Sequence, residues 1–403
     1  MPVDYLSLAP QQRDLLAGIP FDGHHLVTGP PGSGKSLLAV QRAVMLALTG
    51  TPVALLTRSN LLRQSLEPLA AALGPEQDAD RARGRGADRD RNTSRNTGRN
   101  TGRNTGLATG PGTGLEVGTV HRWLHTWHRG LTGDPAPQTP DGWFDWPLVF
   151  RRAAQQPGTA PVLVLDEGQD LPVDFYRLCR LLGARVTVFA DECQRITDTQ
   201  STLAEIAAVL GGPGRHDLTD NHRNTRPLAA LAAHFHVGAV PPPLPERPGP
   251  GAVLRRYADA REVTDHIARH TRGNPGHRTG VILRHTHHQL DLQARLEPLL
   301  PAGRLQTYSG KATGGRYRDL TLDRPGVTLL NRASAKGLDF DTVFVPDTHL
   351  DAAVDPTAAA LRMAYYVLVT RARGELHLGY AGDREPPLLA GVPRELLGRY
   401  GGG

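Results

Sequence analysis

Gly29-Pro30-Pro31-Gly32-Ser33-Gly34-Lys35-Ser36 is the segment from which the architecture of this chain can be read. It fits the pattern G-x-x-x-x-G-K-[ST], whose glycines let backbone N–H groups turn toward phosphate oxygens. An apolar run, Leu26-Val27, precedes it, and a helix-like run from Leu37 to Leu48 follows. A strand, a glycine-rich turn and a helix N-terminus in this order are typical of a phosphate-binding loop. The alternative, a fortuitous glycine-rich turn, is rare in a chain with only three lysines.

The loop predicts two ligands, ATP and Mg²⁺. The ammonium group of Lys35 would reach the β- and γ-phosphates, and the Ser36 hydroxyl would bind the metal ion. We therefore expect Lys35 to take part in catalysis as well as in nucleotide binding. Backbone N–H groups would surround the phosphates at three glycines: Gly29, Gly32 and Gly34.

Composition limits the classes of protein to which the chain can belong. Its 403 residues suggest two to three domains. No apolar run approaches the length of a membrane span and no signal segment opens the chain, so we expect no membrane contact. Because Cys179 and Cys193 are the only cysteines, we expect no disulfide framework and a reducing, cytoplasmic compartment. The net charge of +6 favours a polyanionic partner, although an arginine-rich codon bias would produce the same charge.

Short, continuously apolar runs predict an α/β fold with parallel sheets covered by helices on both faces. In the first half these runs lie at His25–Thr28, Val53–Thr57, Val162–Asp166 and Val186–Ala190. Strand-like runs recur in the second half at Thr279–Arg284, Val327–Asn331, Thr342–Pro346 and Glu375–Tyr380, with helix-like runs at Arg261–Arg272, Gln289–Leu300 and Ala358–Arg371. This second unit has no phosphate loop, so we expect the nucleotide in the cleft between the two units.

Two segments of unusual composition indicate how the chain is divided. We place the first domain at residues 1–215 and the second at residues 216–403. Within the first, residues 76–116 carry Arg-Asn-Thr-Gly repeats and are predicted to be a disordered insertion. Its arginines could contact nucleic acid, or it could be a solvated surface loop. Within the second, the proline-rich residues 240–251 predict a stiff connector.

Acidic residues follow one of the apolar runs of the first half, in the order Asp166-Glu167-Gly168-Gln169-Asp170. An acid at a strand tip beside a phosphate loop can hold Mg²⁺ through water, and we assign this role to Asp166. Glu167 would then orient and deprotonate the attacking water. A solvated acidic turn is the alternative.

This acidic block resembles the D-E-x-Q-D motif of the UvrD/Rep-like branch of superfamily I helicases. Further blocks resemble motifs of that family in the same order, and order and spacing together are more specific than any single block. The resemblance implies two RecA-like domains with ATP and Mg²⁺ in the cleft between them. The additional blocks are Leu8–Arg13, Thr57–Asn60, Thr119–Arg122, Ala190–Ile196, Leu218–Thr225, Ser334–Phe340 and Tyr366–Ala372.

At the nucleotide site, the resemblance implies a role for further residues. Gln12 would read the adenine edge, and Gln194 would sense the γ-phosphate. Arg223 and Arg371 match two arginines that contact the γ-phosphate from across the cleft, where such a group can raise the rate by about 10³–10⁵. The block around Lys336 adds two nucleotide-binding positions, Gly337 and Asp339.

At the nucleic-acid site, the match to the family is incomplete. Positions at which the family stacks bases on aromatic side chains carry other residues here, for example Arg58 and Val120. The implied contacts to the nucleic-acid backbone are Thr57, Thr119 and His121. Four tryptophans could substitute as stacking groups: Trp123, Trp127, Trp143 and Trp146. The i, i+4 spacing of Trp123 and Trp127, however, favours a buried helix face for these two.

We therefore expect an ATP hydrolase that acts as a translocase or helicase on single-stranded nucleic acid, with DNA favoured and RNA the alternative. The chain lacks the large accessory domains of family helicases, so a partner protein could supply unwinding or targeting. The competing hypothesis is a helicase-like ATPase switch or regulatory subunit that docks a partner protein and does not unwind DNA. A small-molecule kinase would leave the second unit, with Lys336 and Arg371, unexplained.

Overall fold

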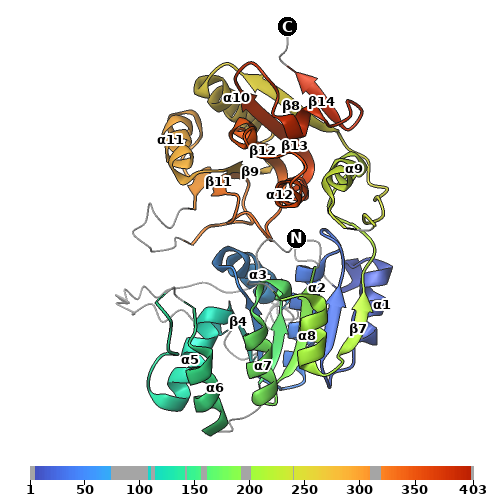
Figure 1. Ribbon diagram of the computed structural model, residues 1–403, viewed down its shortest axis with the longest axis vertical. Coiled ribbons are helices and arrows are strands. Elements are labelled where there is room, and N and C mark those ends of the chain that lie inside the picture. Colours follow the sequence, from blue (N-terminus) through green and yellow to red (C-terminus); the bar gives the residue numbers. More distant parts are fainter. Residues whose placement is uncertain are drawn as a thin grey trace, which may run out of the picture.

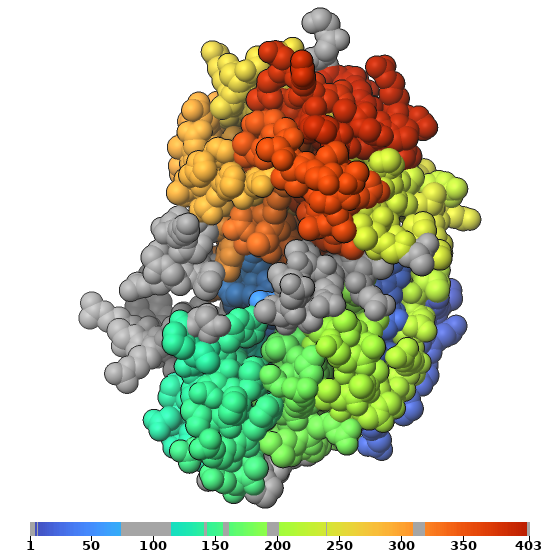
Figure 2. Space-filling model, in the orientation of Figure 1, coloured from blue at the N-terminus to red at the C-terminus, as the bar shows by residue number. Residues whose placement is uncertain are grey.

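The computed structural model describes residues 5–73, 108–109, 114–140, 143–155, 161–191, 201–238, 240–308 and 319–400. They form two seven-stranded sheets, each with its own helices, one after the other along the chain. Figure 1 shows the first half, in blue and green, below the second half, in yellow to red. Figure 2 gives the same view in space-filling form. The two halves are in contact, since the backbone N–H of Leu320 donates to Oε1 of Gln64 at 2.7 Å.

The first sheet has the strand order β3-β4-β2-β5-β6-β1-β7. Neighbouring strands are parallel except β3, which pairs antiparallel with β4. Strands β2 and β5 are buried along their whole length, as their continuous apolar runs predicted. The strand bounds are β1 His25–Thr28, β2 Val53–Thr57, β3 Ala108–Thr109, β4 Leu115–Thr119, β5 Val162–Leu165, β6 Arg185–Ala190 and β7 Gly214–Asp217.

Helices cover both faces of the first sheet and divide its core into two layers. One layer packs against α1, α2 and α3, and the other against α5, α6, α7 and α8. The two layers arise because successive side chains of a strand point to opposite faces. The helices are α1 Pro10–Gly18, α2 Lys35–Leu48, α3 Asn60–Leu73, α5 Val120–Thr132, α6 Trp146–Gln155, α7 Val173–Leu181 and α8 Leu203–Leu210.

The second sheet has the order β10-β11-β9-β12-β13-β8-β14 and is parallel throughout. Helices α9, α12 and α13 cover one face, and α10 and α11 cover the other. The strands are β8 Ala252–Tyr257, β9 Arg278–Leu283, β10 Leu305–Thr307, β11 Gly326–Asn331, β12 Phe340–Val345, β13 Ala372–Ala381 and β14 Leu397–Tyr400. The helices are α9 Arg226–Phe235, α10 Ala260–Gly273, α11 Thr286–Leu296, α12 Ala359–Val369 and α13 Pro387–Ala390.

The α/β class and the two parallel sheets are confirmed, but two expected boundaries need correction. Strands β3 and β4 lie partly inside the insertion expected at 76–116, because Leu115 and Val117 point into the core and fix β4 beside β2. Most of that insertion lies outside the described residues. Strand β7 pairs with β1 as far as Asp217 and Leu218 packs in the core of the first half, so the chain passes to the second half at residues 219–225, slightly beyond the expected boundary at 215/216.

The proline-rich residues 240–251 connect α9 to β8, so this connector lies within the second half. No helix in the described part of the chain combines the length and the apolar character that crossing a membrane requires.

Candidate nucleotide site and nucleic-acid groove

The phosphate loop lies between β1 and α2, as its sequence predicted. Gly32 and Gly34 have φ angles of +85° and +90°, in the left-handed region that favours glycine. A Cβ atom at Gly32 would lie 2.2 Å from Oδ1 of Asn221, and one at Gly34 would lie 2.4 Å from Nε2 of Gln12. Both positions therefore require glycine for backbone conformation and for close approach.

Lys35, the first residue of α2, is buried and folds back over the loop. Its Nζ donates hydrogen bonds to the carbonyl oxygens of Gly29 at 2.6 Å and Pro30 at 2.9 Å. It also forms an ion pair with Asp191, which follows β6, at 3.3 Å. The ammonium group is thus held at the mouth of the loop, where a phosphate could replace these acceptors.

Gln12 supports the loop from α1. Its Nε2 donates to the carbonyl oxygen of Ser33 at 2.9 Å, and its Oε1 accepts from the backbone N–H of Ala9 at 3.0 Å. The neighbouring Gln11, which the sequence analysis did not assign, donates from Nε2 to Oγ1 of Thr219 at 2.8 Å. Gln11 therefore links α1 to the segment that enters the second half; its position beside Gln12 was the only sequence signal for it.

Asp166 follows β5 and is completely buried. Neither carboxylate oxygen makes a hydrogen bond with the described residues. Burial and, after it, the charge of Glu167 raise the pKa of the Asp166 carboxyl to about 7, while the nearby Ser36 hydroxyl and Lys35 act in the opposite direction. A buried carboxylate beside a hydroxyl is a set of oxygen ligands that fits Mg²⁺.

Glu167 is the one residue other than glycine with a positive φ, 55°, in the described ranges. Its carboxylate accepts a hydrogen bond from Nε2 of Gln169. Burial raises the pKa of the Glu167 carboxyl, but the charges of Lys336, Lys35 and Arg371 outweigh it and leave the pKa below its usual value. Glu167 is therefore ionised at neutral pH, as a general base must be.

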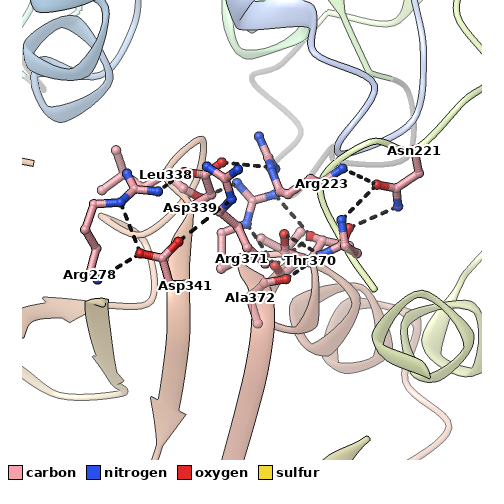
Figure 3. A network of polar contacts seen from close by, with 12 residues as sticks. Asn221, Arg223, Arg278, Leu338, Asp339, Asp341, Thr370, Arg371 and Ala372 are labelled. Carbon is pink, nitrogen blue, oxygen red and sulfur yellow. Dashed lines mark hydrogen bonds and ion pairs between the residues drawn. The ribbon is translucent and has the colours of Figure 1, made fainter. Parts of the chain in front are cut away.

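The opposite wall is formed by an arginine–aspartate network that Figure 3 shows from close by. Nε of Arg223 lies 3.1 Å from Oδ2 of Asp339, and Nη2 of Arg278 lies 3.3 Å from Oδ1 of the same carboxylate. Burial raises the pKa of Asp339, but Arg223 and the other nearby arginines outweigh it and lower the pKa below its usual value. Asn224 anchors the Arg223 segment by donating to the carbonyl oxygen of Ala372 at 2.6 Å.

Arg371 is also part of this network, but its guanidinium group is buried among acceptors of the second half. It donates to the carbonyl oxygens of Leu338 at 3.1 Å and Val367 at 3.0 Å, and to Oγ1 of Thr370 at 3.1 Å. Burial lowers the pKa of Arg371 to about 10. Arg371 does not line the cavity, but it lies close enough to Arg223 and Asp339 for their charges to act on its pKa.

A cavity of about 550 Å³ joins residues of both halves. It contains most of the residues that the sequence analysis assigned to the nucleotide. Gly29, Asp166 and Arg371 lie outside its lining, and Gln194 lies outside the described residues. The assigned residues on its wall are Gln12, Gly32, Gly34, Lys35, Ser36, Glu167, Arg223, Gly337 and Asp339.

A second, larger groove of about 860 Å³ adjoins this cavity, and Glu167 lines both. The three residues assigned to the nucleic-acid backbone lie on its wall: Thr57, Thr119 and His121. The Thr57 hydroxyl is buried and makes no hydrogen bond with the described residues. The Thr119 hydroxyl caps α5 by accepting from the N–H of Arg122 at 3.2 Å, and Nε2 of His121 contacts Nε2 of Gln138 at 2.8 Å.

Aromatic side chains line this groove from positions other than those of the family motifs. Trp143 and Phe144 come from the segment before α6, Trp146 is the first residue of α6, and Tyr308 comes from the second half. The guanidinium group of Arg58 lies 5.1 Å from the centre of the Trp143 ring. Trp143 and Trp146 were predicted candidates, whereas Phe144 and Tyr308 were not, because only the tertiary structure brings them to the groove.

Trp123 and Trp127 behave differently from these groove residues. Their rings stack with a centroid separation of 6.2 Å on α5, and Trp123 is buried in the core. The expected buried helix face is therefore confirmed for this pair.

An ion pair between Lys336 and Asp170 crosses from the second half to the first at the floor of the groove. Nη1 of Arg58 donates to the backbone carbonyl of Asp170 at 3.0 Å. The Lys336–Asp170 ion pair links the acidic block that contains Glu167 to the block that contains Gly337 and Asp339.

No protein-family model matches the chain, and no curated protein matches its sequence. Solved structures are similar in fold. Dbp5 of S. cerevisiae bound to RNA and ADP BeF3 has a TM-score of 0.52 and 12% identity over 99% of this chain and 95% of that one. Its L327V variant, bound to the same ligands, gives a TM-score of 0.53 and 12% identity over the same shares. At such low identity the similarity shows the fold alone.

The described residues form two RecA-like domains. The first RecA-like domain supplies the phosphate loop, Asp166 and Glu167, and the second supplies Gly337, Asp339 and Arg371. Arg223 lies on the segment between them. The structure thus gathers residues from distant blocks of the sequence around one cavity at the domain boundary.

Proposed function

We propose that this protein is an ATP hydrolase that uses nucleotide turnover to move along single-stranded nucleic acid. The observation that supports this most directly is the shared cavity. It brings Lys35 and Glu167 of the first RecA-like domain to face Arg223 and Asp339. A γ-phosphate bound there would meet groups from both sides, so its loss would change the contact between the domains.

Hydrolysis in this site needs an ionised base and stabilised phosphate charge. Glu167 orients and deprotonates the attacking water, and Lys35 exchanges the carbonyl oxygens of Gly29 and Pro30 for phosphate oxygens. Ser36 and Asp166 would hold Mg²⁺, which supplies positive charge at the phosphates. Gln12 has one N–H and one lone pair beyond its two observed hydrogen bonds, and we assign these to the adenine.

The arginines act from the far side of the cavity. As the domains close, Arg223 would leave Asp339 and contact the γ-phosphate. Arg371 would then also move from its buried position to contact the γ-phosphate. We also propose that Gln194 senses the γ-phosphate, as the resemblance to UvrD/Rep-like helicases implies. Closure with ATP and opening after hydrolysis would then alternate through differential contacts to a single ligand.

The second groove is the proposed track for the nucleic acid. Thr57, Thr119 and His121 would contact its backbone, and the aromatic rings around Trp143 would stack on bases. Glu167 lines both the groove and the nucleotide cavity. A nucleic-acid strand in the groove would therefore lie against this carboxylate, the proposed general base for water activation. On the resemblance to UvrD/Rep-like helicases we propose DNA as the track, with RNA as the alternative.

A helicase-like ATPase switch is the second candidate. It is favoured by the compact organisation, since the described residues form two RecA-like domains with no accessory domain among them. Such a protein would bind ATP in the same cavity, dock a partner protein and not unwind DNA.

As for location, we propose the cytoplasm, on the basis of the low cysteine content.

The experiment that separates these functions is ATP turnover without nucleic acid and with single-stranded DNA, duplex DNA or single-stranded RNA, each at low and high salt. The motor predicts strong stimulation by a single strand that weakens as salt rises. The Glu167→Gln variant controls for contaminating ATPases. Turnover that none of the three nucleic acids stimulates at low salt would contradict the motor and favour the switch.

A further inference from the structure

A cluster of histidines lies in the second RecA-like domain, away from both the nucleotide cavity and the groove. It sits between α10 and β13, on the sheet face that α10 covers. Leu376 and Leu378 of β13 point into the core on the α12 side, so Glu375 and His377 point the other way, toward α10. His270 of α10 meets them there.

The side chains in this cluster are close enough to share one ion. Nε2 of His270 lies 2.7 Å from Oε2 of Glu375, and Nε2 of His377 lies 3.6 Å from the same oxygen. One ligand atom from each residue lies within 4.8 Å of the others. Tetrahedral coordination with bonds of about 2.0–2.1 Å separates ligand atoms by roughly 3.3 Å, so the cluster needs only small adjustments.

The hydrogen bonding of the cluster is incomplete. Both ring nitrogens of His377 and Nδ1 of His270 are buried and make no hydrogen bond with the described residues. Buried polar atoms without partners are costly, and a bound cation would give a lone pair of His377 a partner. In the ranges that the structure covers, no other three His, Cys, Asp or Glu residues bring one ligand atom each this close together.

The surroundings suit a metal centre. The His377 ring stacks on Phe344 at a centroid distance of 4.5 Å, which fixes its plane. His266 lies one turn before His270 on α10, with its ring 5.2 Å from that of His377. Nδ1 of His266 contacts the Tyr257 hydroxyl at 2.8 Å, which leaves its Nε2 for a ligand. Glu375 is partly exposed, so an ion can enter from solvent.

We propose that His270, Glu375 and His377 form a binding site for a divalent transition-metal ion of the Zn²⁺ type. Two imidazoles and a carboxylate are a ligand set that zinc accepts, with a fourth position for water or for His266. The ion would tie α10 to β13 and stabilise the second domain.

The test is titration of the full, metal-free chain with Zn²⁺ alone, by calorimetry and by metal analysis after dialysis. We expect one Zn²⁺ per chain, and a Co²⁺ form with the visible absorption bands of four-coordinate cobalt. Affinity should fall as the solution is made more acidic, because protons compete with the metal ion for imidazole nitrogens. A chain without saturable binding at a ratio of one would overturn the proposal.

Three variants locate the ion. Glu375→Gln and His377→Phe each remove one ligand, and phenylalanine keeps the ring that stacks on Phe344. Either change should weaken binding by more than about 100-fold, beyond the 10–100-fold cost of losing an outer-shell partner. His287→Asn is the matched control, because His287 lies in a separate group of histidines with His285 and His288.

Circular dichroism and the unfolding temperature of the metal-free variants show whether each folds, so two independent ligand variants keep the test decisive. Zn²⁺ should raise the unfolding temperature of the parent chain and of His287→Asn, and leave that of His377→Phe unchanged. Binding that survives both ligand variants, or that only His287→Asn abolishes, would refute the assigned site.

Discussion

Arg223 and Asp339 form an ion pair, with 3.1 Å between Nε and Oδ2, on the wall of the cavity that faces the phosphate loop. Arg278 contacts the same carboxylate at 3.3 Å. Asp339 therefore holds the guanidinium group that we expect to meet the γ-phosphate, and the two anions would compete for it. On domain closure the Arg223 guanidinium group would therefore exchange Asp339 for the γ-phosphate.

Replacing Asp339 with asparagine should lower the free energy of unfolding by an amount that depends on pH. The pKa of Asp339 is lowered in the folded state, so its ionised form contributes stability above the unfolded pKa, near 3.8. Asp339→Asn should cost about 1 kcal/mol of unfolding free energy at pH 7, as expected for a partly exposed pair. The difference from the parent should vanish as pH falls through the folded pKa.

Urea unfolding at several pH values measures this difference, with Glu395→Gln, a change at an exposed acid, as the control. Equal stability of Asp339→Asn and the parent at pH 7 would show that the ion pair contributes nothing to the fold.

Glu167→Gln should bind ATP and hardly turn it over. The substitution keeps a side-chain oxygen for Gln169 but removes the base, and general bases contribute about 10²–10⁴ in rate. We expect kcat to fall by at least about 100-fold while the affinity for Mg-ATP changes little. Steady-state turnover and equilibrium nucleotide binding check the two halves of this prediction, and near-parental kcat would remove Glu167 from its role.

The two arginines should respond differently to replacement by alanine. Arg223 lines the cavity, so Arg223→Ala should lower kcat by about 10³-fold and cost about 1 kcal/mol of unfolding free energy, from the loss of its ion pair with Asp339. Arg371 is buried and donates to Leu338, Val367 and Thr370, so Arg371→Ala takes the donor from the buried Leu338 carbonyl, at a cost of about 1–3 kcal/mol, and removes the packing of a large buried side chain. It should lose both turnover and stability.

Turnover together with thermal unfolding separates the two effects. An Arg371→Ala chain as stable as the parent would disagree with the observed hydrogen bonds, and an Arg223→Ala chain with full turnover would disagree with its catalytic role.

The aromatic groove predicts a specific loss of nucleic-acid binding. Base stacking contributes about 1–3 kcal/mol per base, so Trp143→Ala should weaken single-strand affinity by about 5- to 150-fold. Trp127→Ala is the matched control, since Trp127 packs beside the core on α5 and does not line the groove. Fluorescence anisotropy with a labelled oligonucleotide measures both, and equal affinities for the two variants would exclude Trp143 as a stacking group.

Much of the fold could be predicted because its strands are short, buried and apolar. The predicted bounds of β1 and β2 agree with the structure, since every residue from Val53 to Thr57 is buried. The start of β4 could not be predicted, because Leu115 follows a glycine-rich stretch and is fixed by tertiary contacts, namely pairing with Val53 and burial in the core.

The candidate site was predictable where a motif carries the chemistry and not where tertiary contacts decide. Lys35, Glu167 and Arg223 belong to three sequence blocks that predicted contacts to one nucleotide, and the three residues line one cavity. Nothing in the local sequence indicated that Arg371 would be buried among carbonyl oxygens, or that Tyr308 would reach the groove. Both depend on packing between elements far apart in the chain.

The central claim is that two domains grip one nucleotide, and a crystal structure with Mg²⁺ and a non-hydrolysable ATP analogue tests it most directly. We predict that Lys35 has exchanged the Gly29 carbonyl for a phosphate oxygen. We also predict guanidinium nitrogens of Arg223 and Arg371 within hydrogen-bond distance of the terminal phosphoryl group. A complex in which Arg223 stays on Asp339, and Arg371 stays on the carbonyl oxygens of its own domain, would contradict the account.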